Sequence, residues 1–192
     1  MDVVIGWDIG GAHLKAARAE GSRVVATHQA ATPLWHGLQS LEEAFDHLKS
    51  ELGPADRHAI TMTGELCDAF PSRREGVVGL AAIATRQLAS SRVSLYAGRA
   101  GFVELEEAAD RAADIASANW RASASILARQ IQDALFVDLG STTTDIVPVV
   151  AGRVAAVGYT DSERLKAGEL VYVGLTRAFV MAIVNRAPFG GI

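Results

Sequence analysis

Two places in this chain set an aspartate at the end of an apolar run and a glycine two residues later. Asp8 and Gly10 close the first run, and Asp138 and Gly140 close the second. A glycine turn lets the backbone approach an anion and direct N–H groups at it. An aspartate beside phosphate oxygens needs a divalent cation between them, so the pattern predicts a phosphate site with Mg2+ held by Asp8 and Asp138.

The turn residues supply the rest of this predicted site. Hydroxyl groups in the second turn are neutral donors to phosphate oxygens. In the first turn, Lys15 offers a point charge where the second copy has Asp145, so the two turns are expected to differ in role. The predicted phosphate-binding residues are Gly10, Gly11, Ala12, Gly140, Ser141, Thr142 and Thr143.

The two stretches align without a gap. A shift of 130 positions places Asp8 on Asp138 and Gly10 on Gly140. Aspartate and glycine also favour turns for local reasons, and threonine favours strands, so either copy alone is compatible with a plain hairpin. Two copies in register, each followed by a further apolar strand, favour the phosphate site.

A third segment, Thr61–Asp68, begins in a short apolar run that should form a central strand. Loops at the ends of such strands gather ligands in α/β sheets, so Glu65 and Asp68 are the candidates for a general base. An acidic residue after a glycine is also common in the first turn of a helix, which is the alternative for Glu65.

The other reactive residue types are expected to have structural roles. Cys67 is the single cysteine, which excludes an internal disulfide and a multi-thiolate metal site within one chain. Trp120 lies in an alanine-rich segment and is expected in the core, with a pocket-lining role beside Asn119 as the alternative. The five histidines lack the spacing of a zinc site, and the usual glycine-rich nucleotide motifs are absent from the sequence.

The composition excludes several classes of partner. A chain of 192 residues, 49% hydrophobic and 21% charged, can bury a globular core. Its formal net charge is −4 and it has no basic cluster, so a nucleic-acid partner is not expected. No apolar run reaches the roughly 18 residues of a membrane span, so no membrane partner is expected. A cytoplasmic location is expected for the same reason.

Apolar periodicity divides the chain into strands and helices. The order βββαβαβα is predicted from strands at 3–8, 13–19, 23–30, 59–62 and 93–96 and from helices at 38–52, 73–90 and 104–131, the last interrupted near Ala118-Asn119. The βββ pattern then restarts at 134–138, 144–150 and 154–160, and one further element is expected between Leu175 and Asn185.

This order predicts an α/β fold with mixed sheets covered by helices. Residues 1–132 are expected to form a first lobe and residues 133–192 the start of a second, truncated lobe. A sheet with an open face and edge is a pairing liability. The chain is therefore expected to be part of a longer protein, or to need a second copy or another chain to complete its second lobe.

The duplicated βββαβαβα unit with Asp-x-Gly in each first hairpin resembles the actin-like (ribonuclease H-like) fold of sugar kinases, acetate kinases and Hsp70 proteins. More narrowly, three segments resemble the hydantoinase A/oxoprolinase-related family linked to tetrahydromethanopterin-dependent one-carbon metabolism. These segments are Gly6–Lys15, Thr61–Asp68 and Phe136–Ile146, and the likeness extends through Ala118–Trp120 and Gly168–Tyr172.

This resemblance implies a transferase of methanofuran biosynthesis. The implied reaction joins an aminomethylfuran, carried as its diphosphate, to the phenol oxygen of γ-glutamyltyramine and releases pyrophosphate. Asp8 and Asp138 would hold Mg2+, and Lys15 would stabilise the departing charge. Glu65 or Asp68 would deprotonate the phenol, whose pKa is ordinarily about 10.

The sequence is also compatible with two other functions. An actin-like phosphotransferase or ATPase would use the same turns to grip ATP. A non-catalytic fragment or subunit would act only together with a partner. Pyrophosphate release without ATP would indicate the transferase, ADP formation would indicate the phosphotransferase, and neither product would indicate the third function.

Overall fold

The computed structural model describes residues 2–89, 91–176, 178 and 180–184. By packing, the chain divides into two compact units, Met1–Ala122 and Ser123–Ile192. This division falls within helix α4 (Asn119–Ala128). The lobe boundary predicted from the repeat, after residue 132, stays a prediction.

The first unit begins with the three-stranded meander that the sequence predicts. Its strands and helices are β1 (Val3–Ile9), β2 (His13–Glu20), β3 (Arg23–Ala31), α1 (Gln39–Leu52), β4 (Arg57–Met62), α2 (Arg73–Leu88) and β5 (Arg92–Tyr96). Gly53, with φ of 71°, ends α1. Ser72 begins α2, where its side chain accepts a hydrogen bond from the backbone N–H of Glu75.

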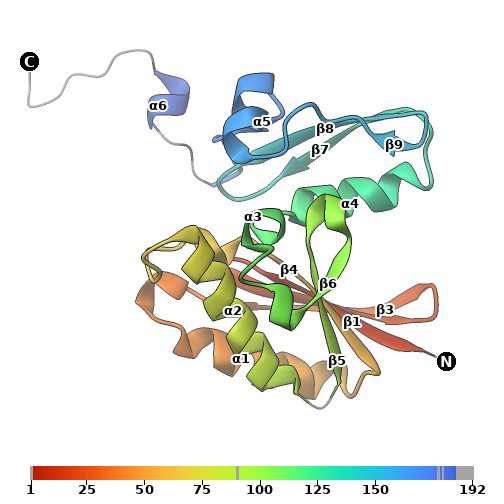
Figure 1. Cartoon of the computed structure of the whole chain (residues 1–192), viewed down its shortest axis with the longest axis vertical. Helices are drawn as coiled ribbons and strands as arrows, with labels where there is room; N and C mark the ends of the chain where they lie inside the picture. The colour runs from red at the N-terminus through yellow and green to blue at the C-terminus, as the bar shows by residue number, and fades with distance from the viewer. Residues whose placement is uncertain (1, 90, 177, 179, 185–192) are drawn as a thin grey trace, which may run out of the picture. The chain divides into compact units, whose positions relative to one another are not determined.

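Together with β6 (Phe102–Glu104), these strands form one mixed sheet (Figure 1), in which the strand order is β3-β2-β1-β4-β5-β6. Strand β1 is parallel to β4, and β4 is parallel to β5, whereas the meander pairs are antiparallel. The mixed α/β architecture expected from the sequence is therefore confirmed, and β1 lies in the middle of the sheet.

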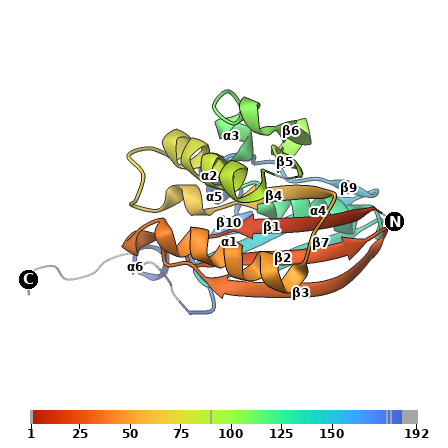
Figure 2. The same cartoon turned by 90° about the horizontal axis from the view of Figure 1, so that it is seen from below.

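The core of this unit lies between the sheet and the helices α1 and α2, which cover one face of the sheet (Figure 2). Alternate residues of β1, namely Ile5, Trp7 and Ile9, are buried there. The ring of Trp7 lies 4.9 Å from that of Phe45 on α1, and its Nε1 donates to Nδ1 of His58 at 3.0 Å. Burial lowers the pKa of His58, which keeps this imidazole a neutral acceptor.

The helical region predicted over 104–131 forms only in part. A short 3-10 helix (Gly98–Ala100) and Gly101, with φ of 78°, turn the chain back to form β6 (Phe102–Glu104), which pairs antiparallel with β5. Another 3-10 helix (Leu105–Glu107) and helix α3 (Ala112–Ile115) precede α4. The predicted interruption is confirmed at Ser117, which has φ of 51°.

In the second unit, β7 (Ala134–Leu139) and β8 (Thr144–Val150) repeat the first hairpin. The prediction of a third strand over 154–160 is wrong, because β9 contains only Arg153–Val154. The chain beyond it is held by the Glu169 carboxylate, which accepts from the backbone N–H groups of Val157 at 2.6 Å and Gly158 at 2.9 Å.

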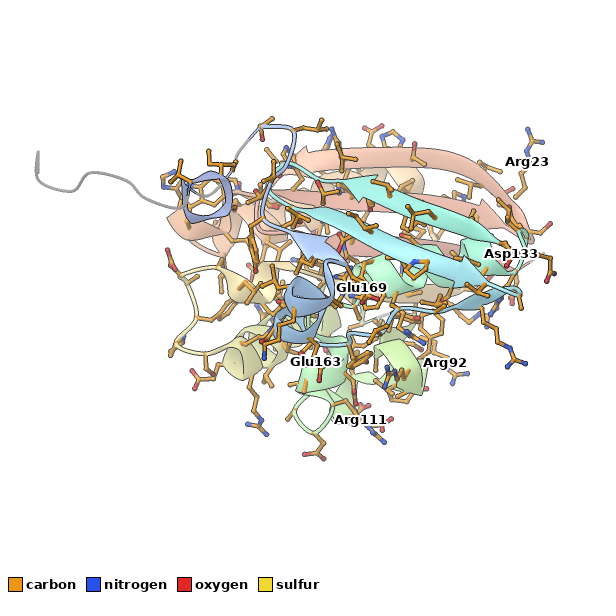
Figure 3. The ribbon with its side chains drawn as sticks, turned by 90° about the horizontal axis from the view of Figure 1, so that it is seen from above. Arg23, Arg92, Arg111, Asp133, Glu163 and Glu169 are labelled. Carbon is orange, nitrogen blue, oxygen red and sulfur yellow. The ribbon has the colours of Figure 1, made fainter. Side chains whose placement is uncertain are left out.

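A helix and a strand not predicted from the sequence follow. Helix α5 (Asp161–Ala167) begins with a reciprocal capping box between Thr160 and Glu163 and ends at Gly168 in the left-handed conformation. Strand β10 (Leu170–Val171) pairs with β8. Figure 3 labels Glu163 and Glu169 beside α5. Helix α6 (Val180–Ile183) lies within the further element predicted up to Asn185, a residue outside the described ranges.

The repeated strands β1 and β7 have different surroundings. Leu135, Val137 and Leu139 of β7 occupy the positions of the three core residues of β1, yet they are 65%, 45% and 50% exposed. Strand β1 pairs with β4 on its second edge, whereas β7 pairs only with β8 among the described residues. The second unit therefore presents the apolar face that helices cover in the first.

Among the described residues, none of the helices combines the length and the hydrophobicity needed to cross a lipid bilayer.

The matched positions Ile5 and Leu135 provide a test of this difference. We expect Ile5→Ala to lower the free energy of unfolding by about 2–5 kcal/mol, because it leaves a cavity in a packed core. Leu135→Ala removes an exposed side chain and is expected to change it by less than about 0.5 kcal/mol. Urea unfolding followed by far-ultraviolet circular dichroism measures both. Equal losses in the two variants would contradict the assignment of an open face to β7.

Candidate functional site

Asp8 lies near the end of β1 on the sheet face opposite α1 and α2. Cross-strand register places Lys15 of β2 on one side of it and Thr61 of β4 on the other. Its Oδ2 lies 3.4 Å from Lys15 Nζ, and its Oδ1 accepts from Thr61 Oγ1 at 3.3 Å. The first unit therefore brings Asp8 and Lys15 together, and their roles as site residues stay a prediction.

This group borders a hollow of about 540 Å3, which is within the range of small-molecule sites. All of its lining belongs to the first unit. Besides the three polar residues named above, the lining residues are Gly6, Trp7, Ala16, Ala17, Thr27, His28, Gln29, Ala59, Ile60, Tyr96, Phe102 and Ala122. The hollow therefore combines a charged pair with small and aromatic side chains.

The glycine turns have the same closing hydrogen bond in both repeats. The Gly10 N–H donates to the His13 carbonyl at 3.0 Å, and the Gly140 N–H donates to the Thr143 carbonyl at 2.9 Å. A Cβ at Gly10 would lie 2.9 Å from that acceptor oxygen. Gly10 therefore contributes the absence of a side chain, since its own N–H closes the hairpin.

The loop after β4 packs directly on the first turn. A Cβ at Gly64 would lie 2.8 Å from Leu34 Cδ1 and 3.2 Å from the carbonyl oxygens of Ile9 and Gly10. The Thr63 N–H donates to the Ile9 carbonyl at 2.9 Å. A side chain here would require Leu34 to move and both carbonyl groups to shift by a few tenths of an ångström, so glycine favours the close approach of the loop to the turn.

Glu65, which follows in this loop, is a buried carboxyl. Its Oε1 accepts from Ser117 Oγ at 2.9 Å and lies 3.4 Å from Arg73 Nε, while Oε2 has no hydrogen-bond partner within the described part of the chain. Burial raises the pKa of Glu65, although the bonds from Ser117 and Arg73 partly oppose the shift. Ser117 was not predicted from the sequence, because only its spatial position reveals its role.

Asp68 lies in the exposed turn that follows. Neither Glu65 nor Asp68 lines the hollow beside Asp8. The two candidate bases are therefore separated in environment, one buried and one exposed, although three positions separate them in the sequence.

In the second unit, the counterpart of the pair formed by Asp8 and Lys15 consists of two carboxylates. Asp138 is exposed and lies opposite Asp145 in the register of β7 and β8. Arg164 of α5 donates from Nη1 to Asp145 Oδ1 at 2.7 Å. Burial raises the pKa of Asp145, and the charge of Asp138 raises it further against the effect of Arg164.

The chain that follows β10 forms backbone hydrogen bonds with the second turn. The Leu175 N–H donates to the Gly140 carbonyl at 3.0 Å, and the Thr176 N–H donates to the Ser141 carbonyl at 3.1 Å. A Cβ at Gly174 would overlap the Thr142 N–H group. Ser141 is exposed and Thr142 and Thr143 are half-buried, so the predicted hydroxyl donors lie at the surface of this unit.

The donor chemistry at both aspartates suits Mg2+. The described residues contain no cluster of three or more His, Cys, Asp or Glu side chains that could hold a metal ion. Magnesium usually takes one or two carboxylates and completes its shell with water and substrate phosphate, so a single accessible carboxylate is sufficient. Asp8 and Asp138 each present one.

The burial of Glu65 predicts a pH dependence of stability. Because its folded-state pKa is raised, the stability it contributes is complete below the unfolded pKa and is lost as the pH rises through the folded pKa. We expect Glu65→Gln, which stays neutral, to gain stability relative to wild type as the pH rises above the ordinary pKa of a glutamate, about 4.3.

Urea unfolding followed by tryptophan fluorescence measures this gain, since all three tryptophans lie in the first unit. Asp68→Asn removes an exposed charge from the same loop and serves as the control. A loss of stability in Glu65→Gln that grows as the pH rises would show that the fold favours the charged form and would contradict this prediction.

Comparisons with known proteins match most of the chain. The family described as Hydantoinase/oxoprolinase matches residues 56–190. The chain is 35% identical over 190 residues to (4-{4-[2-(gamma-L-glutamylamino)ethyl]phenoxymethyl}furan-2-yl)methanamine synthase of Methanocaldococcus jannaschii, covering 98% of this chain and 56% of that protein. It is 47% identical over 58 residues to the protein of the same name from Methanococcus vannielii, covering 30% of this chain and 26% of that protein.

A solved structure, that of the ethanolamine utilization protein EutJ from Carboxydothermus hydrogenoformans, is similar with a TM-score of 0.48 and 16% identity, covering 81% of this chain and 50% of that chain. The present chain thus spans about half the length of the Methanocaldococcus jannaschii relative. From the match over residues 56–190, the chain belongs to the hydantoinase/oxoprolinase family.

Proposed function

We propose that this chain carries part of the site of a transferase of methanofuran biosynthesis. The observation that supports this most directly is the pair formed by Asp8 and Lys15 beside Thr61, at a hollow with aromatic lining. The two synthases with which the chain aligns are named for a product in which a phenol oxygen is joined to the methylene of a furan. A site for such a product must hold both an aromatic ring and a leaving group.

In the proposed reaction, the phenol oxygen of γ-glutamyltyramine attacks the methylene carbon of an aminomethylfuran diphosphate. The bond from that carbon to the diphosphate oxygen breaks, the phenol loses its proton, and pyrophosphate departs. Magnesium held by Asp8 would neutralise charge that develops on the diphosphate, and Asp138 stays a predicted magnesium ligand of the second unit. Lys15 would bind the same oxygens, and Thr61 orients the Asp8 carboxylate by its hydrogen bond.

The residue that takes the phenol proton stays a prediction. Glu65 has the raised pKa that suits a base near neutral pH, but Ser117 and Arg73 hold it inside the first unit. Asp68 is exposed and needs no rearrangement to meet a substrate. A cytoplasmic location likewise stays a prediction from the sequence.

An actin-like phosphotransferase is the second candidate function. The observation in its favour is that the N–H groups of Gly10 and Gly140 each donate the hydrogen bond that closes their own turn, so the two hairpins close in the same way. A turn of this kind suits the phosphates of ATP as well as a furan diphosphate. The products distinguish them, because a phosphotransferase forms ADP and the transferase forms pyrophosphate without ATP.

Calorimetric titration tests the proposed phosphate site at Asp8 and Lys15. We expect magnesium pyrophosphate to bind the purified chain, and Asp8→Asn and Lys15→Met each to weaken binding by about tenfold, or ~1.4 kcal/mol. Asp110→Asn, an exposed acid elsewhere in the first unit, is the control. Omission of magnesium should weaken binding to the same degree as Asp8→Asn. Equal affinity in all these titrations would remove Asp8 and Lys15 from the site.

Supplying γ-glutamyltyramine and the furan diphosphate tests the reaction itself. Pyrophosphate and the ether product, detected by mass spectrometry, would support the transferase. ADP formed from magnesium ATP would support the phosphotransferase instead. Failure of both with pyrophosphate still bound would indicate a third role, a subunit that acts only with a partner.

We also propose that the open face of β7 is covered by a segment of the same kind as β4, α1 and α2. The first unit provides the reason, because the residues of β1 at the matching positions are buried by those elements. The occupant would supply one strand parallel to β7 and helices with apolar faces over Leu135, Val137 and Leu139.

Co-expression with the part of the Methanocaldococcus jannaschii relative that this chain does not match tests the occupant. We expect the two polypeptides to purify together and Val137→Lys to separate them, since a buried lysine is costly. Val24→Lys, at an exposed position of β3, is the control. Self-association of the wild-type chain through β7, or a complex indifferent to Val137→Lys, would contradict the proposal.

A further inference from the structure

One row of side chains crosses the exposed face of the first sheet from β6 to β3. Register pairs Phe102 with Tyr96, and Asp8 with both Thr61 and Lys15. Tyr96 follows Leu95, which pairs with the residue before Thr61, so the row continues from β5 to β4. Every residue of this row lines the hollow. The row therefore runs from an aromatic end to a charged pair.

The hollow exists because the positions around the row hold small residues. Gly6 and Ala17 face each other on β1 and β2, and Ala59 and Ala122 complete the lining. In the second repeat the positions of Gly6 and Ala17 hold a phenylalanine and a valine, which also pair with each other. The same strand register therefore accommodates large side chains, and the first unit leaves their space open.

The aromatic end presents a ring to this space. The rings of Tyr96 and Phe102 meet edge to face, with centroids 5.4 Å apart, and Phe102 is 62% exposed whereas Tyr96 is buried. A single exposed phenylalanine is common on protein surfaces. Here it lines the same hollow as an ion pair, a combination typical of ligand sites, where apolar walls meet a few polar groups.

We propose that the hollow binds the planar ring of a substrate against Tyr96 and Phe102, with the reacting end of that substrate at Asp8 and Lys15. Tyr96 lies on β5, two strands from β1, so about 10 Å separates Tyr96 from Asp8. That span fits a five- or six-membered ring with one linking atom and a polar group. The ring chemistry is shared by the furan donor and the phenol acceptor, and this identification rests on the proposed function.

Saturation-transfer NMR with furfurylamine and with tyramine, each in separate samples, tests the ring subsite. We expect saturation of the ring protons of at least one probe, which tells whether the donor or the acceptor ring binds. Phe102→Ala is expected to reduce the signal about two- to twelvefold, since one aromatic contact contributes about 0.5–1.5 kcal/mol. Phe102→Tyr, which keeps the ring, should retain it.

Gly6→Val tests the hollow without removing any contact. A Cβ at Gly6 would meet nothing closer than the Ala17 carbonyl oxygen at 4.0 Å, and valine favours strands, so the variant is expected to fold. It should abolish saturation of the probe by filling the hollow. Val24→Ala, outside the hollow, is the control.

The titration of magnesium pyrophosphate separates this proposal from the transferase. Ring binding that is lost in Gly6→Val and Phe102→Ala supports the subsite, even if pyrophosphate does not bind and the transferase fails. Absence of ring binding in wild type, or ring binding unchanged in both variants, overturns the subsite, even if pyrophosphate binds.

Discussion

The alternation of side chains along β1 is the constraint on which the first unit depends. Successive residues of a strand point to opposite faces, so Ile5, Trp7 and Ile9 enter the core while Gly6 and Asp8 face the hollow. A shift of one residue in the pairing of β1 would exchange these two sets. The packing that stabilises the sheet thereby also fixes Asp8 between its neighbours on β2 and β4, and fold and site share one register.

The internal repeat shows how two copies of one hairpin acquire different chemistry. Both close with the same turn bond, yet the carboxylate faces a lysine in the first copy and a second carboxylate in the second. Two acids placed directly opposite repel each other. Arg164 of α5 offsets this repulsion from outside the hairpin, whereas the matching position in the first unit holds Leu34, on a short 3-10 helix (Leu34–His36). The second copy thus depends on tertiary structure for a charge that the first copy carries on its own strand.

Much of this fold could be predicted from local patterns. Apolar periodicity placed β1 to β5 and both long helices, because each element buries one regular stripe of residues. Strand β6 was missed, since three residues carry too little pattern. Helix α5 was missed although Thr160, Glu163 and Gly168 are ordinary signals for the two ends of a helix. The position of Asp8 beside Lys15 followed from the hairpin. The contact of Glu65 with Ser117 depends on residues 52 positions apart, which no local pattern reveals.

The close packing of Gly64 joins parts of the molecule that are separate in the sequence. Its contacts with Leu34 and with the carbonyl groups of Ile9 and Gly10 leave no room for the hairpin turn to move alone. The next residue, Glu65, is bound to Ser117 at the junction between α3 and α4. The loop of Gly64 and Glu65 therefore contacts both the first turn and that junction, some fifty residues further along the chain. Gly64 and Glu65 thus connect the first turn with the start of α4.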